Sequence, residues 1–212
     1  MRKVIASINM TLDGYMSGPN CDLDWHFEKW GPDLATAFGQ QLSYADTILL
    51  GRVTYSAMAR YWPQKAQDLS YPREDIAFAD MMNSYAKIVF SKTLTSATWN
   101  NTRLVRRSLK TEKQKLKRQA GKDMIIYGSG SLVDSMLQLQ LIDEYVLWVH
   151  PIILGGGKAL FGLVPEKLPL RLTRTHSFRS GVVMLCYELL RKPKNALLPI
   201  KEPAMESIIQ EK

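Results

Sequence analysis

The chain has 212 residues, 46% of them hydrophobic, which is enough for one domain with a sizeable core. No apolar run approaches the roughly 18 residues of a membrane helix, and two cysteines provide no disulfide framework, so we expect a cytoplasmic protein without a membrane association. The net charge of +8 favours an anionic partner.

Short apolar segments alternate with helical patterns, which predicts an α/β fold. Proline is favoured in the first turn of a helix, so we expect a helix to begin at Pro32. Another helix follows Gly130, where apolar residues recur at helical spacing. The expected strands and apolar runs are, in chain order, 3–10, 47–50, 86–90, 103–106, 124–127, 142–154, 170–177 and 182–190.

The last two segments flank Gly181 and predict a closing pair of strands. Beyond them, three prolines and mixed charges indicate an exposed tail. We therefore expect one domain over residues 1–190 and a C-terminal tail over 191–212.

A strand-to-helix turn is predicted at Gly128, Ser129, Gly130 and Ser131. Small residues there let an anion approach the backbone, and the free N–H groups of the following helix point at it. Taken alone, the same residues are more often an ordinary turn, so both interpretations remain open. Val133 stands where the dinucleotide fingerprint has its third glycine, so a standard Rossmann unit is not expected.

Two other strand ends carry residues suited to an anion. Gly51, Arg52 and Thr54 follow the second predicted strand, and Ser91 and Lys92 follow the third. Because ligands of open α/β sheets bind at the carboxyl ends of strands, three such ends in one chain favour a phosphate-bearing ligand.

A basic cluster follows the fourth predicted strand. Its members are Arg103, Arg106, Arg107, Lys110, Lys113, Lys115, Lys117 and Arg118, opposed only by Glu112. A solvated surface helix explains this cluster simply. Nucleic-acid binding would need a recognition helix or an aromatic platform as well, and the sequence indicates neither. A phosphorylated small molecule is therefore the better partner for the charge.

The spacing of these motifs resembles the dihydrofolate reductase-like superfamily, and most closely its branch related to the C-terminal reductase domain of riboflavin biosynthesis. The matching segments are S-I-N-M-T-L-D-G-Y (7–15), I-L-L-G-R-V-T-Y (48–55), V-F-S-K-T-L (89–94), I-I-Y-G-S-G-S-L-V (125–133) and P-I-I-L-G-G-G-K-A-L-F (151–161). The resemblance implies an eight-stranded, mostly parallel sheet with flanking helices and a C-terminal antiparallel hairpin. It also implies NADPH as hydride donor, and members of this branch often form homodimers.

The resemblance further implies that glycine, hydroxyl and cationic residues at the strand ends hold the cofactor. These are Gly51, Arg52 and Thr54 for its phosphates, Ser91, Lys92 and Arg107 for the 2′-phosphate of the adenosine ribose, and Gly128, Ser129, Gly130 and Ser131 for the pyrophosphate. Arginine suits a phosphate because its planar fork bonds two oxygens at once.

The substrate side rests on fewer residues. By the resemblance, Asp33 could protonate or orient a substrate beside the nicotinamide, although an acid at a helix N-terminus is also favoured by the dipole. Asp13 borders the same region, or simply belongs to an Asp-Gly turn. Trp25 is expected either to line the pocket or to belong to the core. The three histidines have no metal-ligand neighbour in the sequence, so no metal is expected.

The leading hypothesis is an NADPH-dependent reductase of a small heterocyclic or carbonyl substrate, similar to a pterin or a riboflavin precursor. The zinc signature of the deaminase that accompanies the reductase in bifunctional riboflavin enzymes, H-x-E with P-C-x-x-C, does not occur in this sequence. The alternative hypothesis is a non-catalytic nucleotide-binding or regulatory module that contacts nucleic acid through the basic helix.

Overall fold

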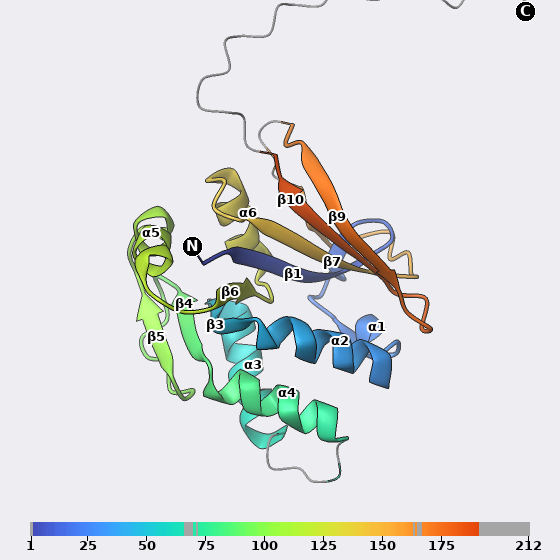
Figure 1. The fold of residues 1–212 in the computed structure, drawn as a ribbon, viewed down its shortest axis with the longest axis horizontal. Helices are drawn as coiled ribbons and strands as arrows, with labels where there is room; N and C mark the ends of the chain where they lie inside the picture. Colours follow the sequence, from blue (N-terminus) through green and yellow to red (C-terminus); the bar gives the residue numbers. More distant parts are fainter. Residues whose placement is uncertain (1, 66–69, 71, 163, 165–166, 191–212) are drawn as a thin grey trace, which may run out of the picture.

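The computed structural model describes residues 2–65, 70, 72–162, 164 and 167–190, and the predicted tail lies outside them. At its centre is an eight-stranded sheet (Figure 1). In spatial order its strands are β5 (Thr102–Val105), β4 (Ala86–Phe90), β3 (Ala45–Gly51), β6 (Asp123–Ile126), β1 (Val4–Thr11), β7 (Glu144–His150), β10 (Val183–Leu189) and β9 (Leu170–Ser177).

The direction of the strands confirms the predicted fold class. Neighbouring strands from β5 to β7 are parallel, and β10 and β9 are antiparallel. The central strand β1 pairs with β6 from Val4 opposite Met124 and with β7 from Ile5 opposite Glu144. All carboxyl ends from β5 to β7 therefore lie along one edge of the sheet, and this edge positions the candidate site.

Helices cover both faces of the sheet, with α2, α3 and α4 on one face and α5 and α6 on the other (Figure 1). The helices are α1 (Asp24–Phe27), α2 (Pro32–Ser43), α3 (Arg52–Lys65), α4 (Arg73–Ser84), α5 (Leu109–Arg118) and α6 (Gly130–Gln138). The helix predicted at Pro32 begins there, with proline at its first position. The helix predicted after Gly130 is α6.

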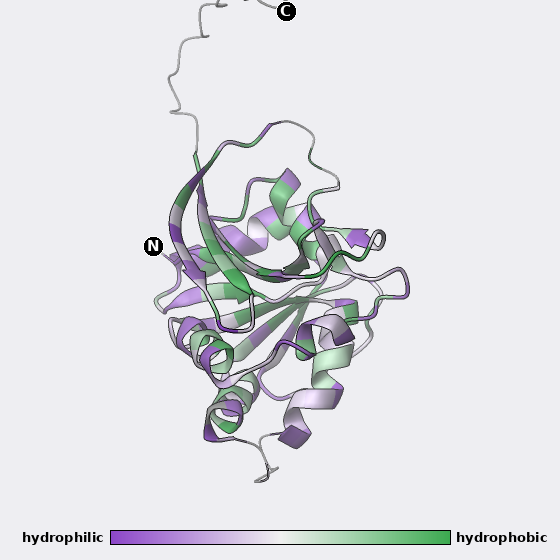
Figure 2. Cartoon of the chain, turned by 90° about the vertical axis from the view of Figure 1, so that its right-hand side faces the viewer, coloured by the Kyte–Doolittle hydropathy of each residue, from purple (hydrophilic) through white to green (hydrophobic). Residues whose placement is uncertain are grey.

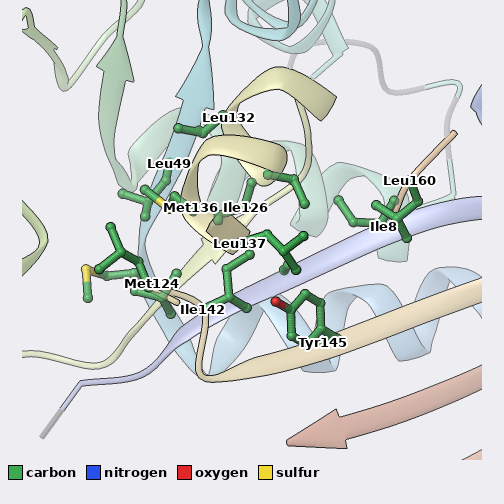
Figure 3. Close-up of a cluster of buried hydrophobic side chains, with 14 of the residues drawn as sticks. Ile8, Leu49, Met124, Ile126, Leu132, Met136, Leu137, Ile142, Tyr145 and Leu160 are labelled. Atoms are coloured by element: carbon green, nitrogen blue, oxygen red, sulfur yellow. The ribbon is translucent and has the colours of Figure 1, made fainter. Parts of the chain in front are cut away.

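Alternation along the strands divides the core into two layers. Ile126 packs in the layer beneath α6, where Figure 3 shows it close to Met136 and Leu137, whereas Ile125 packs in the layer beneath α2 and α4. A strand that is buried on both faces has a continuous run of apolar residues in its sequence. For this reason β6 could be predicted from the sequence. Figure 2 shows the hydrophobic residues gathered between the sheet and its helices.

The second layer is anchored by Trp148 of β7, which is fully buried. Its indole ring stacks on Phe38 of α2 at 4.0 Å between centroids, and its Nε1 donates to Ser7 Oγ at 2.9 Å. A buried aromatic ring with its polar atom satisfied contributes packing without a desolvation cost, so Trp148 holds α2 against the sheet.

Several elements were not predicted from the sequence. They are α1, α4 and a small two-stranded sheet formed by β2 (Tyr15–Ser17) and β8 (Lys158–Ala159). The two short strands pair with each other from distant parts of the chain, so no local pattern reveals them. The end of α4 depends on Lys87 of β4, whose buried ammonium donates to the carbonyl oxygens of Met82, Asn83 and Tyr85 at 2.8–2.9 Å.

Candidate cofactor and substrate site

A cleft of about 310 Å³ lies at the carboxyl edge of the sheet, where β3, β4 and β5 end and α3, α5 and α6 begin. Its lining residues are Gly51, Arg52, Val53, Phe90, Ser91, Lys92, Val105, Arg106, Arg107, Leu109, Ser129, Ser131, Leu132 and Ser135. The cleft therefore joins all three strand ends that carry anion-binding motifs in the sequence.

Seven of the ten predicted cofactor-binding residues line this cleft: Gly51, Arg52, Ser91, Lys92, Arg107, Ser129 and Ser131. The other three, Thr54, Gly128 and Gly130, are not among its lining residues. A Cβ atom added to Gly128 would lie 3.5 Å from Thr54 Oγ1, so those two residues are neighbours beside the cleft. Their roles stay predictions.

The charge of the cleft is of one sign. Arg52, Lys92, Arg106 and Arg107 are exposed, and no acidic residue belongs to the lining of this described cleft. Arg106, which the sequence analysis did not select, donates to the carbonyl oxygen of Leu94 at 2.7 Å. No hydrogen bond or ion pair within the described residues engages the side chains of Arg52, Lys92 or Arg107. These three cations are therefore available to an anion.

Two glycines explain how the strand ends come so close. A Cβ atom at Gly51 would lie 2.0 Å from Ser129 Oγ and 3.1 Å from Ser129 Cβ, so the glycine favours the close approach of the turns after β3 and β6. Gly128 has φ +102°, a backbone conformation that residues with a Cβ atom rarely adopt. The Gly128–Ser129 peptide is cis. The close approach leaves the N-terminus of α6 beside the cleft.

Gly130 faces away from the cleft. A Cβ atom there would lie 2.2 Å from Met16 Cε and 2.5 Å from Lys158 Cε, which belong to the small β2–β8 sheet. The glycine therefore leaves room for the ends of the Met16 and Lys158 side chains, and the Lys158 ammonium lies close to the same turn. The sequence analysis assigned no role to Lys158, so it missed this contact.

Asp13 holds two loops together. Its Oδ1 accepts from Thr11 Oγ1 at 2.6 Å, and its Oδ2 accepts from the backbone N–H groups of Leu154 and Gly155 at 3.1 and 2.8 Å. The bond from Thr11, followed by those from the backbone, lowers the pKa of Asp13. The carboxylate therefore ties the loop after β1 to the loop after β7, and its predicted role beside the substrate stays a prediction.

Asp33 lies exposed at the start of α2. Its Oδ1 accepts from the backbone N–H of Leu34 at 2.9 Å, and its Oδ2 accepts from that of Arg179 at 3.2 Å. The second bond ties the helix to the β9–β10 hairpin, so the carboxylate is fixed at the rim of the sheet's carboxyl edge.

Trp25 is the buried residue of α1, and its side chain lies against His150 at the end of β7. Its ring meets His150 edge-on at 5.1 Å and His26 at 5.6 Å between centroids. Burial, the neighbouring His26 and Lys29 lower the pKa of His150 to about 4. Burial likewise lowers the pKa of His26. Within the described residues no group of three potential ligands could hold a metal ion.

The basic helix is partly neutralised by the protein itself. Arg103 forms an ion pair with Glu112 at 2.5 Å, and Lys117 forms one with Asp143 at 2.5 Å. Glu112 is nearly fully buried, so its ion pair with Arg103 joins α5 to β5 and leaves Arg103 less available to a ligand. None of the helices formed by the described residues has the length and apolar character needed to cross a bilayer.

The chain is similar to known proteins over most of its length. The family model of the RibD C-terminal domain matches residues 2–184. Two uncharacterized proteins of Bacillus subtilis (strain 168) are related to it: YyaP is 35% identical, covering 88% of this chain and 94% of YyaP. YwjB is 27% identical, covering 85% of this chain and 95% of YwjB.

Solved structures share its fold. A putative riboflavin biosynthesis protein from Shewanella sp. PV-4, 24% identical, covers 89% of this chain and 99% of its own, with a TM-score of 0.72. Dihydrofolate reductase from Enterococcus faecalis, 12% identical, covers 88% of this chain and 96% of its own, with a TM-score of 0.54. At these identities the likeness concerns the fold alone.

Proposed function

Because this chain belongs to the RibD C-terminal domain family, we propose that it is an NADPH-dependent reductase of a small heterocyclic or carbonyl substrate. The resemblance stated from the sequence is confirmed at the level of the family, and the fold is that of dihydrofolate reductase. The substrate is expected to be similar to a pterin or to a riboflavin precursor.

The observation that carries the proposal is the unopposed charge of the cleft. Arg52, Lys92 and Arg107 approach it from the ends of three different strands and lack partners within the described residues. Each charge-assisted hydrogen bond to a phosphate would contribute about 1.5–3 kcal/mol. A doubly charged 2′-phosphate suits such a cluster, whereas the hydroxyl group of NADH would leave the cations unpaired.

The residues around the cleft also fit the rest of the cofactor. Gly51 and Ser129 leave no space for an added Cβ between their turns, and the first turns of α3 and α6 begin there. Free backbone N–H groups at two helix N-termini favour a pyrophosphate. The nicotinamide supplies the hydride chemistry when the cofactor is bound, and the chain supplies orientation and a pocket.

Asp33 is the residue we assign to protonating or orienting the substrate. Hydride transfer to a C=N or C=O bond leaves negative charge on the heteroatom, so a donor must stand within reach. Asp33 and Asp13 are both exposed and both accept backbone hydrogen bonds, and Asp13 also accepts from the side chain of Thr11. We therefore assign the substrate to Asp33 and the positioning of the loops to Asp13.

Calorimetric titration with NADPH and with NADH at low salt tests the proposal. We expect NADPH to bind at least about tenfold more tightly, because one charge-assisted bond alone has that value. Arg107→Gln should remove most of the preference, whereas Arg118→Gln, at the far end of the helix that follows Arg107 and outside the cleft lining, should retain it. Equal affinities for the two cofactors, or an equal loss in both variants, would refute this assignment.

A further inference from the structure

The turn before α6 has a second side, which lies outside the lining of the cleft. Ser129 and Ser131 line the cleft, whereas Gly130 between them faces Met16 and Lys158. A Cβ atom added at Gly130 would lie 3.0 Å from Lys158 Nζ, so the ammonium group lies against the start of the helix. Lys158 is therefore a cation at the edge of the proposed cofactor site to which the proposed function assigns no role.

The N-terminus of α6 has no cap within the described part of the chain. Ser129 stands at the N-cap position without a capping bond, and its hydroxyl lies 3.2 Å from Ser131 Oγ instead. None of the described residues accepts a hydrogen bond from the backbone N–H of Gly130 or Ser131, and Gly130 is buried. Helices normally satisfy these donors with a capping side chain, water or a ligand. The first turn of α6 is therefore open to an acceptor from outside the chain.

The position of the Lys158 ammonium is unfavourable in the free protein, because a helix N-terminus is the positive end of the helix dipole. Among the described residues no group forms a hydrogen bond or an ion pair with this ammonium. Burial raises the pKa of Asp134 on α6, and the Lys158 charge offsets this only in part. An anion bound between the ammonium and the free N–H groups would replace the repulsion by attraction on both sides.

The place of Lys158 along the sheet edge indicates which anion this is. Lys158 belongs to β8, which pairs with β2, the strand that follows β1, with Ser17 opposite Lys158. The strands β6 and β1 are neighbours, and α6 follows β6. A dinucleotide that extends from the cleft toward β1 therefore passes between α6 and β8. With its 2′-phosphate in the cleft, the part that lies at this point is the pyrophosphate.

We propose that Lys158 binds the pyrophosphate of the cofactor together with the first turn of α6, from the side opposite the cleft. NADPH and NADH share this pyrophosphate, so Lys158 raises the affinity for both cofactors. Arg107, by contrast, raises the affinity for the 2′-phosphate that only NADPH carries. This inference rests on the proposed function and adds a binding residue that does not distinguish the two cofactors.

Two fragments of the cofactor separate these roles in calorimetric titrations of the full chain at low salt. Adenosine diphosphate ribose carries the pyrophosphate without a 2′-phosphate, and adenosine 2′-monophosphate carries the 2′-phosphate without a pyrophosphate. Lys158→Gln should weaken the binding of adenosine diphosphate ribose at least about tenfold, the value of one charge-assisted bond, and leave that of adenosine 2′-monophosphate unchanged. Arg107→Gln should have the opposite pattern.

The control variants separate the bond from charge and folding effects. Lys158→Arg keeps the cation and should retain most of the affinity for adenosine diphosphate ribose. Lys115→Gln removes an exposed lysine of α5 outside the cleft lining and should change neither affinity. Urea unfolding should show Lys158→Gln to be as stable as the original chain, because the lost ammonium has no partner among the described residues.

Three results would overturn the role of Lys158: no binding of adenosine diphosphate ribose to the original chain, an unchanged affinity in Lys158→Gln, or an equal loss for both fragments in that variant. The proposed function is tested separately by the comparison of NADPH with NADH. Equal affinities of the original chain for these two cofactors refute the 2′-phosphate assignment, whatever the result for Lys158.

Discussion

The two ends of the site differ in how the protein treats its polar groups. At the phosphate end, Arg52, Lys92 and Arg107 are exposed and lack partners within the described chain. At the proposed substrate end, near the ends of β1 and β7, Trp25 and His150 are buried in a cluster of rings. An exposed cation keeps its water and does not reduce the stability of the fold much. A buried polar ring loses its water, and packing contacts must offset that desolvation cost. Substitutions should therefore change binding at the first end and stability at the second.

The largest expected effect lies beneath the substrate end, at Trp148. Trp148→Ala removes a fully buried ring stacked on Phe38 and should lower the free energy of unfolding by about 3–5 kcal/mol. Trp148→Phe, which keeps a ring, should lose clearly less. Arg107→Gln should change stability by no more than about 0.5 kcal/mol. Urea unfolding of all three variants measures these changes. A similar decrease in the free energy of unfolding for Trp148→Ala and Arg107→Gln would contradict the contrast between the two ends.

The next effect is a pH dependence of stability from His150. Its pKa in the folded protein is about 4, below the usual 6.5. Between these values the unfolded chain binds more protons, so this group stabilises the fold above pH 6.5 and its contribution is lost as pH falls to 4. The loss amounts to about 3 kcal/mol. His150→Phe should flatten the curve in that window, whereas replacing the exposed His176 by glutamine should not.

A smaller effect, on rate alone, is expected at the rim between the two ends. Asp33→Asn keeps an oxygen for the backbone N–H of Leu34 or Arg179 but removes the acid. We expect reduction to slow about 100-fold while NADPH affinity stays the same. NADPH oxidation with the best substrate from a panel of pterins and pyrimidinediones measures it, with the exposed Asp80→Asn as control. Unchanged turnover would remove Asp33 from the mechanism.

The gathering of the phosphate-end residues in one cleft could be predicted from the sequence because its parts are local. Each strand end carries its own glycine, hydroxyl or cation within a few residues, and parallel strands bring these ends to one edge. Gly51, Lys92 and Ser129 illustrate this, since they come from three segments and line one cleft. Arg106 was not selected although it lies beside Arg107, because a cluster of basic residues does not show which members line a cleft.

The substrate end could not be predicted in the same way. Asn9, Trp25 and His150 are distant in sequence and meet only through β1, α1 and β7. Neither an isolated tryptophan nor an isolated histidine distinguishes a core position from a binding position. The loop-clamping role of Asp13 was hidden for the same reason, because its partners Leu154 and Gly155 are about 140 residues away.

The central claim is that the carboxyl ends of the parallel strands hold NADPH, with its 2′-phosphate in the cleft near β4 and β5. A crystal structure of the chain with NADPH tests it most directly. We predict the 2′-phosphate among Ser91, Lys92 and Arg107, with the pyrophosphate against Ser129 and Ser131. A 2′-phosphate bound elsewhere, or a cofactor running away from β1 and β7, would contradict the account.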